Sequence, residues 1–213
     1  MRFMDRREAG RALARALRKM PGLNDALVLA LPRGGVPVGY EVARALGLPL
    51  DVLVVRKLGV PGQEELAMGA VSGSGVLVVN PDVVRALGIG QEQIEARAAH
   101  ERAEIARREA LYRGGRSALD VAGRTALVVD DGLATGSTMM AAVRSLRPVA
   151  GRVVVAVPVG SRGACEDLRR VADEVLCLQT PEPFHAVGEF YEDFWQTSDA
   201  EVAELLAEAN RQG

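Results

Sequence analysis

The chain has 213 residues, of which 48% are hydrophobic and 25% charged, a composition that fits one globular domain and excludes a disordered chain. Its formal net charge of −2 excludes the general basic field that holds nucleic acid non-specifically, although a local phosphate site stays open. No apolar run reaches the roughly 18 residues that span a bilayer, so we expect no membrane partner. The two cysteines, Cys165 and Cys177, have neither metal-ligand nor disulfide-framework spacing, which indicates a reducing cytoplasm.

Apolar strands and helices alternate along the chain. In chain order, the patterns predict a helix over 5–19, a strand over 26–31, a helix over 36–46, a strand over 50–55, a glycine-containing loop over 59–75, a strand over 76–79, a helix over 91–112, a strand over 126–129, a helix over 136–147, a strand over 153–157, a helix over 162–171 and a strand over 175–178. This alternation predicts an α/β fold, with a parallel β-sheet flanked by helices on both faces. Ligands of such sheets bind beyond the carboxyl ends of the strands.

Aromatic residues are scarce and unevenly placed. Five of the eight lie close together near the C-terminal end, namely Phe184, Phe190, Tyr191, Phe194 and Trp195. The core must therefore be built mainly from valine, leucine and alanine. The clustered rings indicate either recognition of an aromatic ligand or a small satellite core, and we expect the satellite core to take four of the five.

The strongest motif follows the strand predicted over 126–129. Two acids, Asp130 and Asp131, precede a run of small and hydroxyl-bearing residues that includes Ala134, Thr135, Gly136, Ser137 and Thr138. Small residues at a helix start let backbone N–H groups converge on an anion such as phosphate. The two acids would repel that phosphate unless the ligand presents hydroxyls to them, as a sugar phosphate does. The alternative is an acidic turn that caps the helix, but capping needs only one acid.

A second glycine-rich loop follows the strand predicted over 26–31. Here Arg33 offers a fork of hydrogen-bond donors, and Gly34 and Gly35 permit unusual backbone geometry. Lys57, one of only two lysines, follows the strand predicted over 50–55. Both features suit a pyrophosphate, and the alternative for each is ordinary surface exposure.

Residues 127–138 resemble the signature with which type I phosphoribosyltransferases bind 5-phosphoribosyl-1-pyrophosphate: an apolar strand, two acids, three variable residues, Thr-Gly and a hydroxyl-rich end. Residues 31–39 are similar to the pyrophosphate loop of bacterial xanthine-guanine phosphoribosyltransferases. The resemblance covers about residues 25–180. It implies the type I phosphoribosyltransferase fold, here with a helical insertion and a small C-terminal hood.

The resemblance also implies a role for each motif. Asp130 and Asp131 would hold the ribose hydroxyls and, with Arg33, form the catalytic set. Gly34, Gly35 and Lys57 would bind pyrophosphate, the loop over 59–75 would close over the site, and the 5-phosphate would lie on Ala134, Thr135, Gly136, Ser137 and Thr138. Mg²⁺ would be bound through the pyrophosphate and ribose oxygens of the substrate, so no protein metal ligand is expected.

The implied reaction transfers phosphoribose to a nitrogenous base and releases pyrophosphate, a reaction of nucleotide salvage. Ala134 departs from the pattern, because relatives that use 6-oxopurines carry aspartate there to exchange a proton with the base, and alanine cannot do so. The acceptor is therefore left open. The alternative function is a regulatory protein that binds the phosphoribosyl donor without transferring it.

We expect one domain over residues 1–213, with a core over about 25–180, a helical insertion over about 80–116 and a hood over about 181–213. The N-terminal helix is a candidate part of the hood. The insertion carries charged residues at helical spacing, including the pair Glu104–Arg108, and forms either a solvated face or a lid or oligomer contact. A homodimer is left open, and no nucleic-acid partner is expected.

Overall fold

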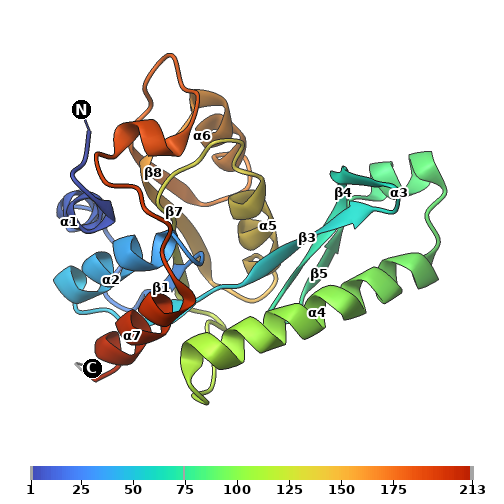
Figure 1. The fold of residues 1–213 in the computed structure, drawn as a ribbon, viewed down its shortest axis with the longest axis horizontal. Coiled ribbons are helices and arrows are strands. Elements are labelled where there is room, and N and C mark those ends of the chain that lie inside the picture. The colour runs from blue at the N-terminus through green and yellow to red at the C-terminus, as the bar shows by residue number, and fades with distance from the viewer. Residues whose placement is uncertain (1, 74, 212–213) are drawn as a thin grey trace.

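A parallel sheet of five strands forms the centre of the computed structural model, which describes residues 2–73 and 75–211 (Figure 1). The strand order is β2-β1-β6-β7-β8, and every neighbouring pair is parallel. The strands are β1 (Leu27–Ala30), β2 (Leu50–Val52), β6 (Thr125–Val129), β7 (Arg152–Val159) and β8 (Glu174–Gln179). The predicted α/β fold is confirmed.

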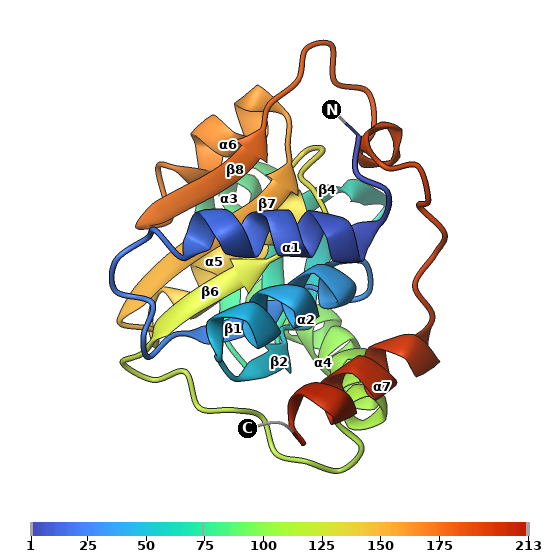
Figure 2. The same ribbon diagram turned by 90° about the vertical axis from the view of Figure 1, so that its left-hand side faces the viewer.

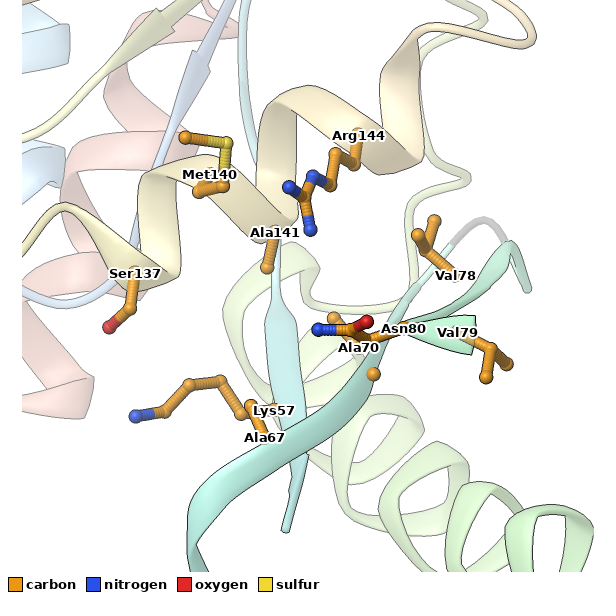
Figure 3. A pocket seen from close by; sticks show the side chains of 11 residues that line it. Lys57, Ala67, Ala70, Val78, Val79, Asn80, Ser137, Met140, Ala141 and Arg144 are labelled. Carbon is orange, nitrogen blue, oxygen red and sulfur yellow. The ribbon is translucent and has the colours of Figure 1, made fainter. Parts of the chain in front are cut away.

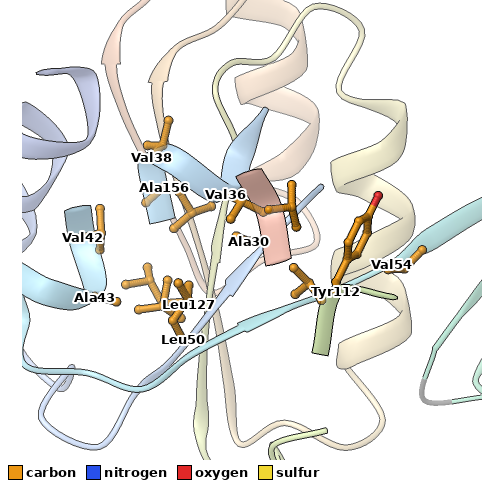
Figure 4. Close-up of a cluster of buried hydrophobic side chains, with 14 of the residues drawn as sticks. Ala30, Val36, Val38, Val42, Ala43, Leu50, Val54, Tyr112, Leu127 and Ala156 are labelled. Atoms are coloured by element: carbon orange, nitrogen blue, oxygen red, sulfur yellow. The ribbon is translucent and has the colours of Figure 1, made fainter. Parts of the chain in front are cut away.

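Helices cover both faces of this sheet (Figure 2). One face carries α1 (Arg6–Leu17), α2 (Gly35–Leu46) and α7 (Asp199–Ala209), and the other carries α5 (Ser137–Leu146) and α6 (Arg162–Leu168). The buried apolar side chains form one cluster on the α1, α2 and α7 side of the sheet, the first apolar cluster, and another on the α5 and α6 side, the second apolar cluster. Alternate residues of β1 point to opposite faces, so Val28 packs into the first cluster and Leu29 into the second. Figure 4 shows part of the first cluster, where small aliphatic side chains gather near the ring of Tyr112. Within the described ranges, no helix is long and apolar enough to cross a bilayer.

A second, antiparallel sheet projects from the core together with two helices (Figure 1). We call residues 55–113 the arm. Its elements are β3 (Val55–Val60), β4 (Gln63–Ser72), β5 (Leu77–Val79), α3 (Pro81–Leu87) and α4 (Gln91–Arg113). The arm contains the predicted strand over 76–79 and the predicted helix over 91–112.

The loop predicted over 59–75 is wrong, because most of it forms the β3–β4 hairpin. The prediction rests on the glycines of this stretch and on the family resemblance, which implies a loop that closes over the site. At Gly69, however, a Cβ atom would lie 2.4 Å from the Val78 carbonyl oxygen, so the missing side chain allows the β4 and β5 backbones to approach. The strand predicted over 50–55 is also divided: β2 ends at Val52, and β3 begins at Val55 in the other sheet.

Helix α4 combines a buried side with a charged, exposed one. Ile94, Ala98 and Ile105 are buried in the cluster that also contains apolar side chains of β3 and β4. On the outer side the predicted pair is present, with Arg108 Nε donating to Glu104 Oε1 at 2.7 Å. Hydrogen bonds from Arg107 and Arg108 lower the pKa of Glu104 to about 2.

The C-terminal segment divides into two parts. The first contains the clustered rings and a 3-10 helix, η1 (Val187–Phe190), and it joins the N-terminal segment through a bridge between Phe3 and Tyr191. The second is α7, a helix that the sequence patterns did not predict. It packs on α2 and α4, and the hydroxyl of Tyr40 donates to Glu208 at 2.6 Å.

A buried ion pair ties the arm to the core. Arg113, at the end of α4, donates through Nε to Asp51 Oδ1 in β2 at 2.9 Å, and only 11% and 7% of the two side chains are exposed. The backbone N–H of Leu119 donates to the other oxygen of Asp51 at 2.9 Å. Removing one partner of such a pair leaves the other charge buried and uncompensated.

We therefore expect Arg113→Ala to lower the free energy of unfolding by about 3 kcal/mol. Chemical denaturation would measure this loss. The matched control is Arg85→Ala, because Arg85 pairs with Asp82 on the arm surface at 2.6 Å and both side chains are largely exposed. Equal stabilities of the two variants would contradict the anchoring role of Arg113.

Candidate functional site

Two loops meet at the carboxyl end of the central strands β1 and β6. Their contact is so close that it requires glycine: a Cβ atom on Gly34 would lie 2.0 Å from Asp131 Oδ2, and one on Gly35 would lie 2.8 Å from the Val129 carbonyl oxygen. The two separate sequence motifs, residues 31–39 and 127–138, therefore form one site. The peptide bond between Pro32 and Arg33 is cis.

The adjacent carboxyl groups of Asp130 and Asp131 are held by several neighbours. Arg6 Nε donates to Asp131 Oδ2 at 2.8 Å, and the backbone N–H of Asp131 donates to Asp130 Oδ1 at 2.8 Å. The hydroxyl of Tyr191 donates to the Asp131 carbonyl oxygen at 2.6 Å. Burial and the neighbouring Asp131 carboxyl raise the pKa of Asp130 well above its ordinary value. Burial also raises the pKa of Asp131, although Arg6 opposes this effect.

The run after the acids lines a cavity of about 180 Å³. Gly136 has a φ of 70° and immediately precedes α5, so the backbone turns sharply before the helix begins. The hydroxyls of Thr135 and Ser137 lie 3.1 Å apart. Hydroxyls and a helix N-terminus in one small cavity suit an anion. The lining residues are Asp130, Gly132, Leu133, Ala134, Thr135, Gly136, Ser137, Thr138, Met139 and Val187.

Arg33 and Lys57, both expected to bind pyrophosphate, lie in different surroundings. Arg33 NH1 is 3.8 Å from Asp199 Oδ1 at the start of α7, and 32% of the Arg33 side chain is exposed. Lys57 lies on β3 and lines a separate cavity of about 160 Å³ between the arm and α5, together with Ser137 and Arg144 (Figure 3). Residues 134–138, which we call the anion loop, share this cavity with Lys57, because Ser137 lines it too. Lys57 therefore lies close to the anion loop although the two are about 80 residues apart in the sequence.

The clustered rings form mainly a satellite core, as expected. Phe3 and Tyr191 are buried there, and ring centroids are 5.4 Å apart for Phe184–Phe190 and 5.0 Å apart for Tyr191–Phe194. Trp195 is the exception, with 84% of its surface exposed. It is the one ring of the cluster with a largely exposed face.

Sequence reasoning missed two residues of this site, Arg6 and Tyr191. Arg6 is one of several arginines in an amphipathic helix, and no motif sets it apart. Tyr191 belongs to the recognised ring cluster, but its contact with the Asp131 backbone depends on how residues 60 positions apart meet. Neither contact has a local sequence signal.

Comparison with known proteins identifies a family model, two curated relatives and a solved structure that are similar to this chain. The family model described as "Phosphoribosyl transferase domain" matches residues 5–195. Two Mycobacterium tuberculosis proteins named as phosphoribosyl transferases, one in strain CDC 1551 and one in strain H37Rv, are each 49% identical over 210 residues, which is 98% of this chain and 47% of theirs. This chain thus spans about half the length of those relatives. The crystal structure of TT1426 from Thermus thermophilus is 45% identical, with a TM-score of 0.89 over 98% of this chain and 99% of that one.

The close approach at Gly34 leads to a stability prediction. In Gly34→Ala, the new methyl group would overlap the Asp131 carboxyl, so the Asp131 side chain must leave its place beside Arg6 or one of the two loops must move, and we expect a loss of about 2 kcal/mol in the free energy of unfolding. The control is Gly163→Ala in α6, where a Cβ atom meets nothing within 4 Å and alanine favours the helix. Thermal and urea unfolding of both variants provide the measurement. A Gly34→Ala variant as stable as Gly163→Ala would contradict the loop contact.

Proposed function

The chain belongs to the phosphoribosyl transferase domain family, and on that premise we propose that it transfers phosphoribose from 5-phosphoribosyl-1-pyrophosphate to a nitrogenous base, with release of pyrophosphate. The observation that carries this proposal is the meeting of an acid pair, an anion cavity and a glycine-rich loop at one end of the sheet. Acceptors for sugar hydroxyls thus lie directly beside donors for a phosphate. A phosphorylated sugar presents these two kinds of group together.

Each part of the site takes one part of the donor substrate. Asp130 and Asp131 accept hydrogen bonds from the ribose hydroxyls. The backbone N–H groups and hydroxyls of residues 134–138 hold the 5-phosphate. Gly34 and Gly35 let the backbone approach the pyrophosphate, while Arg33 and Lys57 supply positive charge. For Arg33 this assignment requires its guanidinium to bind phosphate oxygens in addition to, or instead of, the Asp199 carboxylate 3.8 Å away.

The reaction breaks the bond between ribose C1 and pyrophosphate and forms one to a base nitrogen. Positive charge develops on the sugar ring and negative charge on the leaving group, so cationic side chains contribute most at the pyrophosphate. The base loses a proton as the new bond forms, and that proton passes to solvent or to the leaving pyrophosphate. The arm, whose strands β3, β4 and β5 lie against α5, is the part of the chain positioned to restrict water at the phosphate side.

The chemistry of the site fits a magnesium ion that arrives with the substrate better than one held by a set of protein ligands. No group of three or more histidine, cysteine or acidic side chains able to hold a metal occurs in the described part of the chain, and Asp131 is already paired with Arg6. Mg²⁺ keeps several waters and takes substrate phosphate oxygens as ligands. Held by the pyrophosphate and ribose oxygens, it would neutralise charge on the leaving group.

The site offers an acceptor base fewer polar groups than it offers the donor. Ala134 lines the cavity beside Val187, and its methyl group exchanges no proton with a base. This observation favours an acceptor other than a 6-oxopurine, or the second candidate function, a regulatory protein that binds the donor without transfer. We place the transfer reaction in nucleotide salvage in the cytoplasm, and assembly as a homodimer is part of the same proposal.

Donor binding by the acid pair can be tested directly. We expect the double variant Asp130→Asn, Asp131→Asn to bind 5-phosphoribosyl-1-pyrophosphate at least about tenfold more weakly, because amides replace charged acceptors of the ribose hydroxyls. Isothermal titration calorimetry gives the dissociation constants, and circular dichroism checks the fold. The control is Asp82→Asn, which changes an exposed acid on the arm.

A panel of bases with the donor and Mg²⁺, monitored for pyrophosphate release, separates the two functions. Turnover with any natural base supports the transferase. Donor binding without turnover across the panel supports the regulatory alternative. Unaltered affinity in the double variant would remove the assigned role of the acids, and a wild-type protein that does not bind the donor would overturn both functions.

A further inference from the structure

Arg6 lies where four separate parts of the chain converge. Its Nε donates to Asp131 Oδ2 at 2.8 Å, and its NH1 donates to the Trp195 carbonyl oxygen at 2.7 Å. The guanidinium carbon is 3.9 Å from the centroid of the Phe194 ring. Arg6 Nε also lies 3.3 Å from the position that a Cβ atom on Gly34 would take. The N-terminal helix, the glycine-rich loop, the acid pair and the ring cluster therefore all meet at this side chain.

The stability of α1 does not explain a cation at this position. Arg6 is the first residue of α1, where the helix dipole favours negative charge. The N-cap is provided by Asp5, whose side chain accepts from the backbone N–H of Glu8 at 2.7 Å. Only 12% of the Arg6 side chain is exposed. The compensating interaction for this buried charge is the Asp131 carboxylate.

The contacts of Arg6 also fix its direction. The ring of Phe194 and the carbonyl of Trp195 hold the guanidinium, and its bond to the acid uses Oδ2 of Asp131. On the other side, the Asp131 backbone is held by the Tyr191 hydroxyl. The carboxyl group is thus positioned from two directions by residues outside its own loop.

We propose that Arg6 is a positioning residue of the donor site, which holds the Asp131 carboxylate ionised and oriented to accept the ribose hydroxyls. The inference rests on the proposed function and extends it to the N-terminal helix. Without Arg6, two half-buried neighbouring carboxyls would lie together with no cation bonded to either, and they would share a proton or turn apart. Either change removes an acceptor from the ribose.

Calorimetric titration with 5-phosphoribosyl-1-pyrophosphate tests this role. We expect Arg6→Ala to raise the dissociation constant about tenfold, because a charge-assisted hydrogen bond no longer holds the acceptor. Arg6→Lys should recover part of the affinity, since it keeps the charge. In steady-state kinetics the KM for the donor should rise more than kcat falls. The matched control is Arg7→Ala, because Arg7 lies next on the same helix but pairs with Glu41 at 3.5 Å.

A double-mutant cycle separates positioning from a general structural role. If Arg6 acts through Asp131, then Arg6→Ala should weaken donor binding less than about twofold in an Asp131→Asn background. The same tenfold loss in both backgrounds would overturn the inference, as would an Arg6→Ala variant that binds the donor as tightly as, or more tightly than, the wild type. If the wild type itself does not bind the donor, the proposed function fails, and that result is distinct from these two.

Discussion

Two neighbouring carboxyl groups at the end of β6 place the central constraint on this structure. Asp130 and Asp131 lie where the sheet, two loops and the C-terminal segment meet, and burial opposes their ionisation. A cation must therefore come close to them, and it comes from the first turn of α1. To bring Arg6 there, the N-terminal segment pairs with residues 190–193, and the rings of Phe3, Tyr191 and Phe194 pack behind it. The satellite core thus supports the acid pair even though most of its rings do not face the cavity.

A different kind of interaction connects the arm to the core. The arm has its own sheet, and its buried side chains join the first apolar cluster through α4 and β3. One ion pair crosses from the arm to the core, since Arg113 pairs with Asp51 in β2. Inside the arm, Arg56 Nε donates to the buried Glu101 at 2.8 Å and so joins β3 to α4. Apolar contacts tolerate small shifts, whereas buried ion pairs require particular partners. The arm is therefore anchored to the core at the end of α4, and Lys57 of β3 lines the same cavity as Ser137 of α5.

The parts predictable from sequence are those with a local signal. The buried strands have continuous apolar runs, the anion loop has acids followed by small hydroxyl residues, and the pair Glu104–Arg108 follows helical spacing. The arm hairpin has no such clear signal, because glycine has two opposite meanings, a flexible loop or a close approach of backbones, as at Gly69. The role of Arg6 is not predictable because it depends on Asp131, 125 residues away. Charge compensation between distant segments leaves no periodicity or spacing in the sequence.

The two sides of the site differ in the groups that they present. Where the two loops meet, a Cβ atom on Gly34 would overlap the Asp131 carboxyl, so the backbone of the glycine-rich loop lies directly against the acid pair. In the cavity after the acids, Ala134 and Val187 add apolar surface with few directional groups. Apolar surface discriminates weakly between ligands of similar size, whereas a site with buried polar groups rejects ligands that leave those groups unpaired. Under the proposed function, selection of the sugar phosphate would therefore rest on the acid pair and the loop backbone, and selection of the acceptor on a few apolar side chains.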